Sequence, residues 1–161
     1  ALDKVAPQFA EVADMLAGYG GTDLLCYRAT APQELIDRQA EAWDPLLLWS
    51  ANALDAPLRV TSGVIPIDQP AASLAALQAT VHAYSAFRLA ALHDLIAISG
   101  SLILGLAATR GRLSAAEAWT LSRIDESWQN EQWGVDDDAA ALEAHKREAM
   151  LAAERFFILC G

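Results

Sequence analysis

The amino-acid sequence predicts an all-α fold, a single bundle of six or seven helices around a largely buried, apolar central helix. Three observations lead to this prediction. Alanine, the strongest helix former, occupies about one position in five. Apolar residues recur at helical spacing through most of the chain. Only residues 58–68 have a composition typical of a strand, which is enough for one short strand or a loop.

Length and charge narrow the class of protein. The 161 residues are one domain's length, and a hydrophobic fraction of 54% excludes a disordered chain. Eleven basic against 21 acidic residues give a formal net charge of -10. This charge disfavours nucleic acid and anionic membrane surfaces as partners, because both are bound through clustered lysine and arginine.

The first helix is expected over residues 4–17. The glycines at 18, 20 and 21 should end it, and its apolar residues at helical spacing are Val5, Phe9, Val12, Met15 and Leu16. Residues 23–28 form a loop or a brief extended piece. A second helix then opens at Pro32, and we expect a break at Asp44-Pro45, because proline lacks the backbone donor that a helix interior needs. An apolar helix resumes at residues 46–54.

Two helices are expected in the middle of the chain. Apolar spacing returns at residues 71–90 and leads into residues 95–108, which are apolar on nearly every face. The second stretch is about six residues shorter than the roughly 20 that span a bilayer, so we predict a buried central helix and no membrane insertion.

The last two helices have clear start signals. Ser114 and Glu117 form a capping-box pattern that opens a helix expected to reach Trp133, where Gly134 ends it. Three aspartates at 136–138 favour the start of a final helix through its dipole. The buried stripe of that helix is expected to comprise Leu142, Ala149, Ala153 and Phe156.

Catalytic and metal-binding patterns are weak. The sequence has no nucleophile elbow, dinucleotide fingerprint or phosphate-binding loop, and its two cysteines and three histidines are scattered. We therefore expect no catalytic residue, no metal site and no cofactor, and we expect Cys26 and Cys160 to be reduced, inert thiols.

The segment 119–136 carries the most functional information. On one helical projection Asp125 and Gln132 fall near the core-facing Leu121, so Asp125 is expected to accept hydrogen bonds in the interior. Glu126 projects to the other side. It shares a stripe with Trp119, Arg123, Asn130 and Trp133. This stripe is either covered by another helix of the bundle or exposed to a protein partner, for which tryptophan and arginine are favoured anchors.

Several segments together resemble a known family. The runs Ser122-Arg-Ile-Asp-Glu-Ser-Trp-Gln129 and Trp133-Gly-Val-Asp136 are similar to the signature of the F(1) ATP synthase assembly chaperones that escort the alpha subunit. Three upstream segments agree in order: Asp23 to Arg28, Gln39 with Trp43 to Trp49, and Ser99-Gly-Ser101. One departure is Val135, where the family commonly has an acid.

The resemblance implies an all-α domain without catalytic activity that binds the free alpha subunit and prevents its aggregation. It implies that residues 1–161 are the C-terminal helical domain, without the β domain that precedes it in the family. The partner-binding residues it suggests are Glu126 first and Asp125 second, and their neighbours Trp119, Arg123, Gln129 and Trp133 join them. The expected compartment is the bacterial cytoplasm, or the mitochondrial matrix for a eukaryotic member.

Two other functions stay open from the residues alone. A carboxylate-dependent enzyme would need a second titrating group beside Asp125, and the sequence offers no convincing base. A small-ligand-binding or regulatory helical bundle would need only a pocket, which a sequence does not display.

Overall fold

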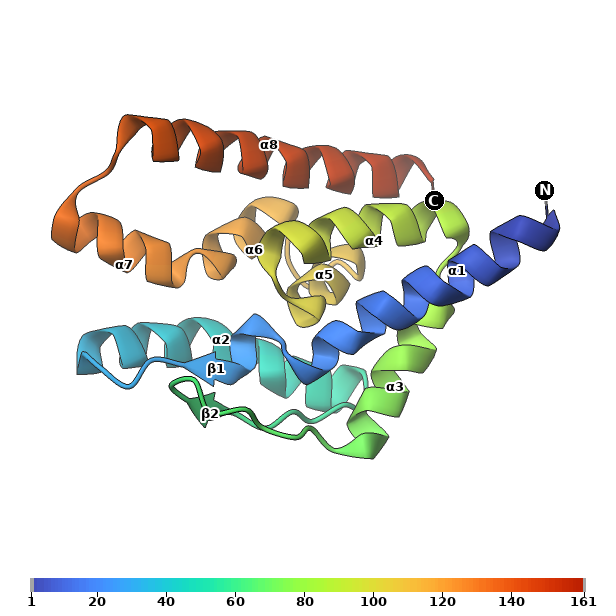
Figure 1. Ribbon diagram of the computed structural model, residues 1–161, viewed down its shortest axis with the longest axis horizontal. Helices are drawn as coiled ribbons and strands as arrows, with labels where there is room; N and C mark the ends of the chain where they lie inside the picture. Colours follow the sequence, from blue (N-terminus) through green and yellow to red (C-terminus); the bar gives the residue numbers. More distant parts are fainter. Residues whose placement is uncertain (1, 161) are drawn as a thin grey trace.

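The computed structural model describes the backbone of residues 2–160 and the side chains of residues 8–160, and its fold is predominantly helical (Figure 1). The described residues form eight α-helices: α1 (Leu2–Ala17), α2 (Gln33–Ala53), α3 (Ala71–His82), α4 (Ala86–Ser99), α5 (Leu102–Thr109), α6 (Ala115–Ser122), α7 (Ile124–Trp133) and α8 (Asp137–Leu159). Two short strands, β1 (Tyr27–Arg28) and β2 (Thr61–Ser62), pair in parallel. The all-α prediction is confirmed.

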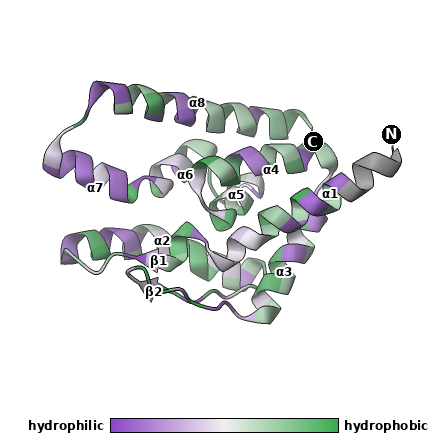
Figure 2. Cartoon of the chain, in the orientation of Figure 1, coloured by the Kyte–Doolittle hydropathy of each residue, from purple (hydrophilic) through white to green (hydrophobic). Residues whose placement is uncertain are grey.

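Helix α5 is the centre of the bundle. Six consecutive residues, from Leu102 to Ala107, are buried, so α5 is apolar on every face (Figure 2). Helices α4, α2 and α6 pack against it. Gly105 permits the close approach of α4, because a Cβ atom there would lie 2.8 Å from Cγ1 of Ile96.

The buried acid Asp23 fixes the start of α5 to the preceding chain. Its Oδ2 accepts the N–H of Ile103 at 3.0 Å, and its Oδ1 accepts the hydroxyl of Ser101 at 2.7 Å and the N–H of Leu25 at 3.1 Å. Desolvation raises the pKa of this carboxyl, and the donated hydrogen bonds oppose that rise. The carboxylate therefore satisfies donors at a helix start that is shielded from water.

Three expected helices are each divided. The stretch 71–90 breaks at residues 83–85, after which Ser85 caps α4. The central stretch 95–108 breaks at Gly100, whose φ of +77° ends α4 in the left-handed region that glycine adopts without strain. The predicted capping box at Ser114 is present, but this helix stops at Ser122 and α7 begins after Arg123, with φ −112° and ψ 24°.

The predicted break at Asp44-Pro45 is wrong. Helix α2 continues through Pro45 to Ala53. The physical reason is the burial pattern: Pro45 faces solvent, so water can satisfy the carbonyl that its missing N–H leaves free. The buried residues Trp43, Leu46 and Leu47 on the opposite face hold the helix against the core.

The predicted stripe of α8 is only half right. Ala153 is buried and Ala149 is half-buried, whereas Leu142 and Phe156 are exposed. Met150 is the buried residue that the pattern missed, because α8 contacts the bundle mainly through its second half, against α4 and α6. In α1, Leu16 is buried, Phe9 and Val12 pack on the core and Met15 is exposed, while the side chain of Val5 lies outside the described residues.

Both cysteines are free thiols, as expected. Cys26 is buried, and burial raises its pKa to about 12, so the thiol stays protonated and unreactive. Cys160 is partly exposed at the end of α8. Among residues 2–160, none of the helices combines the length and apolar character required to cross a membrane.

Candidate functional site

A groove of about 530 Å³ opens between α7 and α8, with α6 at its inner end. The two helices are joined by residues 134–136 and diverge from that turn (Figure 1). The groove gathers four of the six residues that the sequence singled out: Trp119, Arg123, Glu126 and Gln129.

Trp119 and Arg123 form the inner wall of the groove. Trp119 is 8% exposed, and the guanidinium carbon of Arg123 lies 4.2 Å from the centre of its ring. Arg123 also donates to the carbonyl of Ile98 at 3.2 Å, and its Nε lies 2.8 Å from Oε2 of Glu143. Arg123 thus connects the junction of α6 and α7 to α4 and α8.

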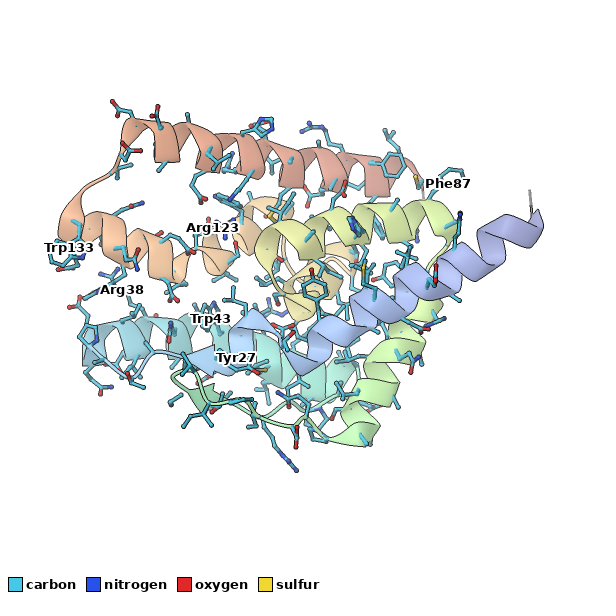
Figure 3. The ribbon with its side chains drawn as sticks, viewed as in Figure 1. Tyr27, Arg38, Trp43, Phe87, Arg123 and Trp133 are labelled. Atoms are coloured by element: carbon cyan, nitrogen blue, oxygen red, sulfur yellow. The ribbon has the colours of Figure 1, made fainter. Side chains whose placement is uncertain are left out.

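Glu126, Asn130 and Trp133 are the exposed members of the predicted stripe. Glu126 forms no hydrogen bond or ion pair with the described side chains that line the groove, so its carboxylate is free to meet a partner. Trp133 is 86% exposed at the end of α7 and lies outside the groove lining (Figure 3). The stripe is therefore divided into a covered half and an exposed half, because the break at Arg123 redirects the second helix.

Asp125 points away from the groove. Its Oδ1 accepts a hydrogen bond of 2.6 Å from Nε2 of Gln39 on α2. The prediction that Asp125 is a structural acceptor facing the interior is confirmed. The same projection placed Gln132 toward the interior, and this was wrong: Gln132 is exposed, since α7 has no fully buried residue.

Sequence reasoning missed the side of the groove that α8 supplies. Leu142, Glu143 and Arg147 line it, together with Val135 from the turn. No local pattern marks these residues, because their role depends on where α8 crosses α7. The only feature that marks this side of the groove as a contact surface is the exposure of two apolar side chains, Val135 and Leu142. The sequence analysis had placed Leu142 in the buried stripe of the last helix.

The chemistry of the groove suits recognition of a protein. It offers apolar surface and both signs of charge, because Glu126, Glu143, Arg123 and Arg147 are all in its lining. It contains no histidine or cysteine, and in the described part of the chain no three histidine, cysteine, aspartate or glutamate residues gather to hold a metal ion.

Comparison with known proteins identifies the family. The family model of the ATP12 chaperone protein matches residues 1–51. The crystal structure of Atp12 from Paracoccus denitrificans is 55% identical, with a TM-score of 0.93 over 98% of this chain and 68% of that one. The chain belongs to the ATP12 chaperone family. A variant of the Paracoccus protein with one aspartate changed to lysine matches equally well, with a TM-score of 0.93.

A more distant relative has the same fold. A candidate chaperone from Agrobacterium tumefaciens is 38% identical, with a TM-score of 0.88 over 97% of this chain and 58% of that one. The resemblance seen in the sequence is thus confirmed for the family. Membership of the ATP12 chaperone family implies a chaperone rather than an enzyme.

Proposed function

We propose that this protein assists assembly of the F(1) ATP synthase by binding the free alpha subunit and preventing its aggregation. The groove between α7 and α8 is the contact surface, and Glu126 is its central charged residue. The setting is the bacterial cytoplasm or the mitochondrial matrix. The observation that carries this proposal is the exposed carboxylate of Glu126, which is unpaired among the described residues, on a groove that also exposes Val135 and Leu142.

The mechanism is sequestration. An unassembled subunit exposes apolar surface and strand edges that are covered in the finished complex, and these surfaces aggregate. A chaperone that binds them lowers the concentration of the aggregation-prone species by mass action, without chemistry. Trp133 and the apolar side chains of the groove supply apolar contact area, and Glu126 fixes the orientation of the client by pairing with a donor on it.

The decisive experiment compares Glu126→Gln and Glu126→Lys with the parent chain in two assays. Light scattering of isolated alpha subunit measures protection from aggregation, and urea unfolding measures stability. Both variants should leave the free energy of unfolding within about 0.5 kcal/mol, because Glu126 is exposed. Affinity for the alpha subunit should fall by about tenfold or more, with the lysine variant weaker because it reverses the charge.

Glu11→Lys is the matched control. Glu11 is an exposed acid on α1, and its reversal changes net charge equally without touching the groove. Full protection by Glu126→Lys with the fold intact would overturn the proposed contact. If Glu11→Lys lost as much protection as Glu126→Lys, the effect would come from net charge and not from this surface.

A further inference from the structure

A second cavity lies at the opposite end of the molecule. It has a volume of about 530 Å³ and lies between the start of α4, the end of α5 and the end of α8. Its lining residues are Thr80, Ala83, Tyr84, Ser85, Arg88, Thr109, Arg110, Phe157 and Cys160. No residue of the first groove is among them.

This cavity is basic in an acidic protein. Arg88 and Arg110 line it and no acidic side chain of the described residues does, although the chain carries 21 acids against 11 bases. Neither Arg88 nor Arg110 forms an ion pair with another described residue, whereas Arg28, Arg38 and Arg123 each do. The start of α4 contributes partial positive charge and the ends of α5 and α8 contribute partial negative charge, so the two arginines supply the positive charge of the site.

Arg88 is held in place but not satisfied. Its guanidinium carbon lies 4.7 Å from the centre of the Phe157 ring, which fixes the plane of the group. Its Nε is buried and has no hydrogen-bond partner among the described residues. A buried charged donor without a partner is costly, so the site is suited to an acceptor from outside.

Hydroxyl groups complete the polar lining. The hydroxyls of Tyr84 and Thr109 lie 2.6 Å apart. The hydroxyl of Thr109 donates to the carbonyl of Gly105 at 3.0 Å, so the hydroxyl of Tyr84 donates to Thr109. The donors that remain for a ligand are the guanidinium groups of Arg88 and Arg110, and guanidinium groups match the oxygens of a carboxylate.

The surroundings indicate a peptide rather than a free ion. Phe87, which precedes the lining residue Arg88, is 70% exposed, and Leu159, which precedes the lining residue Cys160, is 84% exposed. Figure 3 shows Phe87 next to the C-terminal end of α8. Phosphate sites are commonly built from backbone N–H groups of glycine-rich loops, and no glycine lines this cavity. An acidic side chain with apolar neighbours fits both the charge and the rim.

We propose that this cavity is a second docking site, which binds an acidic side chain of a peptide segment flanked by apolar residues, through Arg88 and Arg110. This inference rests on the proposed function in one respect only: the peptide segment is taken to belong to the alpha subunit that the chaperone binds. The two arginines pair with the carboxylate, and Phe87 and Leu159 cover its apolar neighbours.

The test is an NMR titration that follows the arginine Nε–H resonances of the ¹⁵N-labelled protein. The probe is a capped hexapeptide of alanine and leucine with one central glutamate, and its glutamine counterpart and inorganic phosphate are the comparisons. The glutamate peptide should shift the Arg88 resonance and bind about tenfold more tightly than the glutamine peptide. Arg88→Gln and Arg110→Gln should each weaken it about tenfold, and Arg112→Gln, an exposed neighbour outside the lining, should not.

Each other result overturns the proposal. Binding of phosphate without binding of the peptide would make the cavity a phosphate site. Equal binding of the two peptides, or unchanged affinity in Arg88→Gln, would remove the arginines from recognition. Because this titration contains no alpha subunit, its outcome is independent of the Glu126 variants, so failure here and failure of the proposed function are separate results.

Discussion

Gln39 and Asp125 are joined by a hydrogen bond of 2.6 Å, from the amide Nε2 of Gln39 to Oδ1 of Asp125. The amide oxygen of Gln39 accepts the N–H of Ala29 at 2.8 Å. One buried side chain therefore links the loop after β1, helix α2 and the first turn of α7. Asp125 and Glu126 are adjacent in sequence, yet one is a structural acceptor and the other is free.

The first prediction separates these two acids. Asp125→Asn should lower the free energy of unfolding by about 1 kcal/mol, because a hydrogen bond to a charged acceptor becomes one to a neutral acceptor. Asp125→Ala should lower it by about 2 kcal/mol, since the amide of Gln39 then lacks its partner. Urea unfolding measures both. Glu126→Gln is the neighbouring control, and equal stability of all three variants would show that the bond contributes nothing to folding.

The second prediction concerns pH and Asp23. Burial raises the pKa of this carboxyl, so the folded state holds its proton at a higher pH than the unfolded state, for which the value is near 3.8. Stability contributed by this group therefore rises as pH falls from above the raised pKa toward 3.8, and it declines as pH increases through that window. Asp23→Asn removes this titration. It also places an amide NH₂ where Oδ2 accepts the N–H of Ile103, which should cost about 1–3 kcal/mol at neutral pH.

The measurement is the difference in free energy of unfolding between the parent chain and Asp23→Asn at several pH values. That difference should increase as pH is lowered, because all other titrating groups cancel in the subtraction. A difference that is constant with pH would show that Asp23 keeps an ordinary pKa in the fold.

The third prediction is that Pro45→Ala stabilises the protein. Proline inside a helix costs about 3 kcal/mol relative to alanine, and at this exposed position water offsets part of that cost. We expect a gain of about 1–3 kcal/mol in the free energy of unfolding, which thermal or urea unfolding would report. Leu48→Ala, at another exposed position of α2, is the control for helix propensity alone. A destabilised Pro45→Ala would mean that packing of α2 depends on the proline.

The parts of the fold that sequence predicted are those decided locally. The capping box of Ser114 and Glu117 and the apolar run of α5 each depend on neighbouring residues, and both are confirmed. The predicted break at Pro45 was wrong because burial of Trp43 and Leu46 outweighs the cost of a proline inside the helix. That burial depends on the tertiary fold, which the local sequence pattern does not show.

The site was predicted on one side only. The segment around Glu126 could be found because its acids and tryptophans are close in sequence. The side of the groove formed by α8 could not be predicted, because Leu142 and Arg147 line the groove only as a result of the direction that the chain takes after Gly134. The helical projection assumed one straight helix from Ser114 to Trp133, but the chain changes direction at Arg123. This explains why Gln132 was wrongly placed toward the interior and why the stripe around Glu126 was treated as one continuous surface.

The last prediction concerns the mobility of α7, which carries Glu126. None of its residues is fully buried: Ile124 packs on the core at its start, and polar contacts hold the helix against α2. Arg38 on α2 forms an ion pair with Glu131, and its guanidinium carbon lies 4.9 Å from the ring centre of Trp128. A helix held in this way opens locally at a lower free energy than the buried α5.

Hydrogen exchange should therefore be faster for the amides of α7 than for those of α5. Arg38→Gln, which removes the ion pair and the stacking on Trp128, should speed exchange in α7 by about three- to tenfold and leave α5 unchanged. High salt should mimic part of this effect in the parent chain, because the ion pair is exposed and screened. Equal acceleration in both helices would show that Arg38 stabilises the whole fold. Acceleration confined to α7, together with weaker protection of the alpha subunit, would connect the order of this helix to the presentation of Glu126.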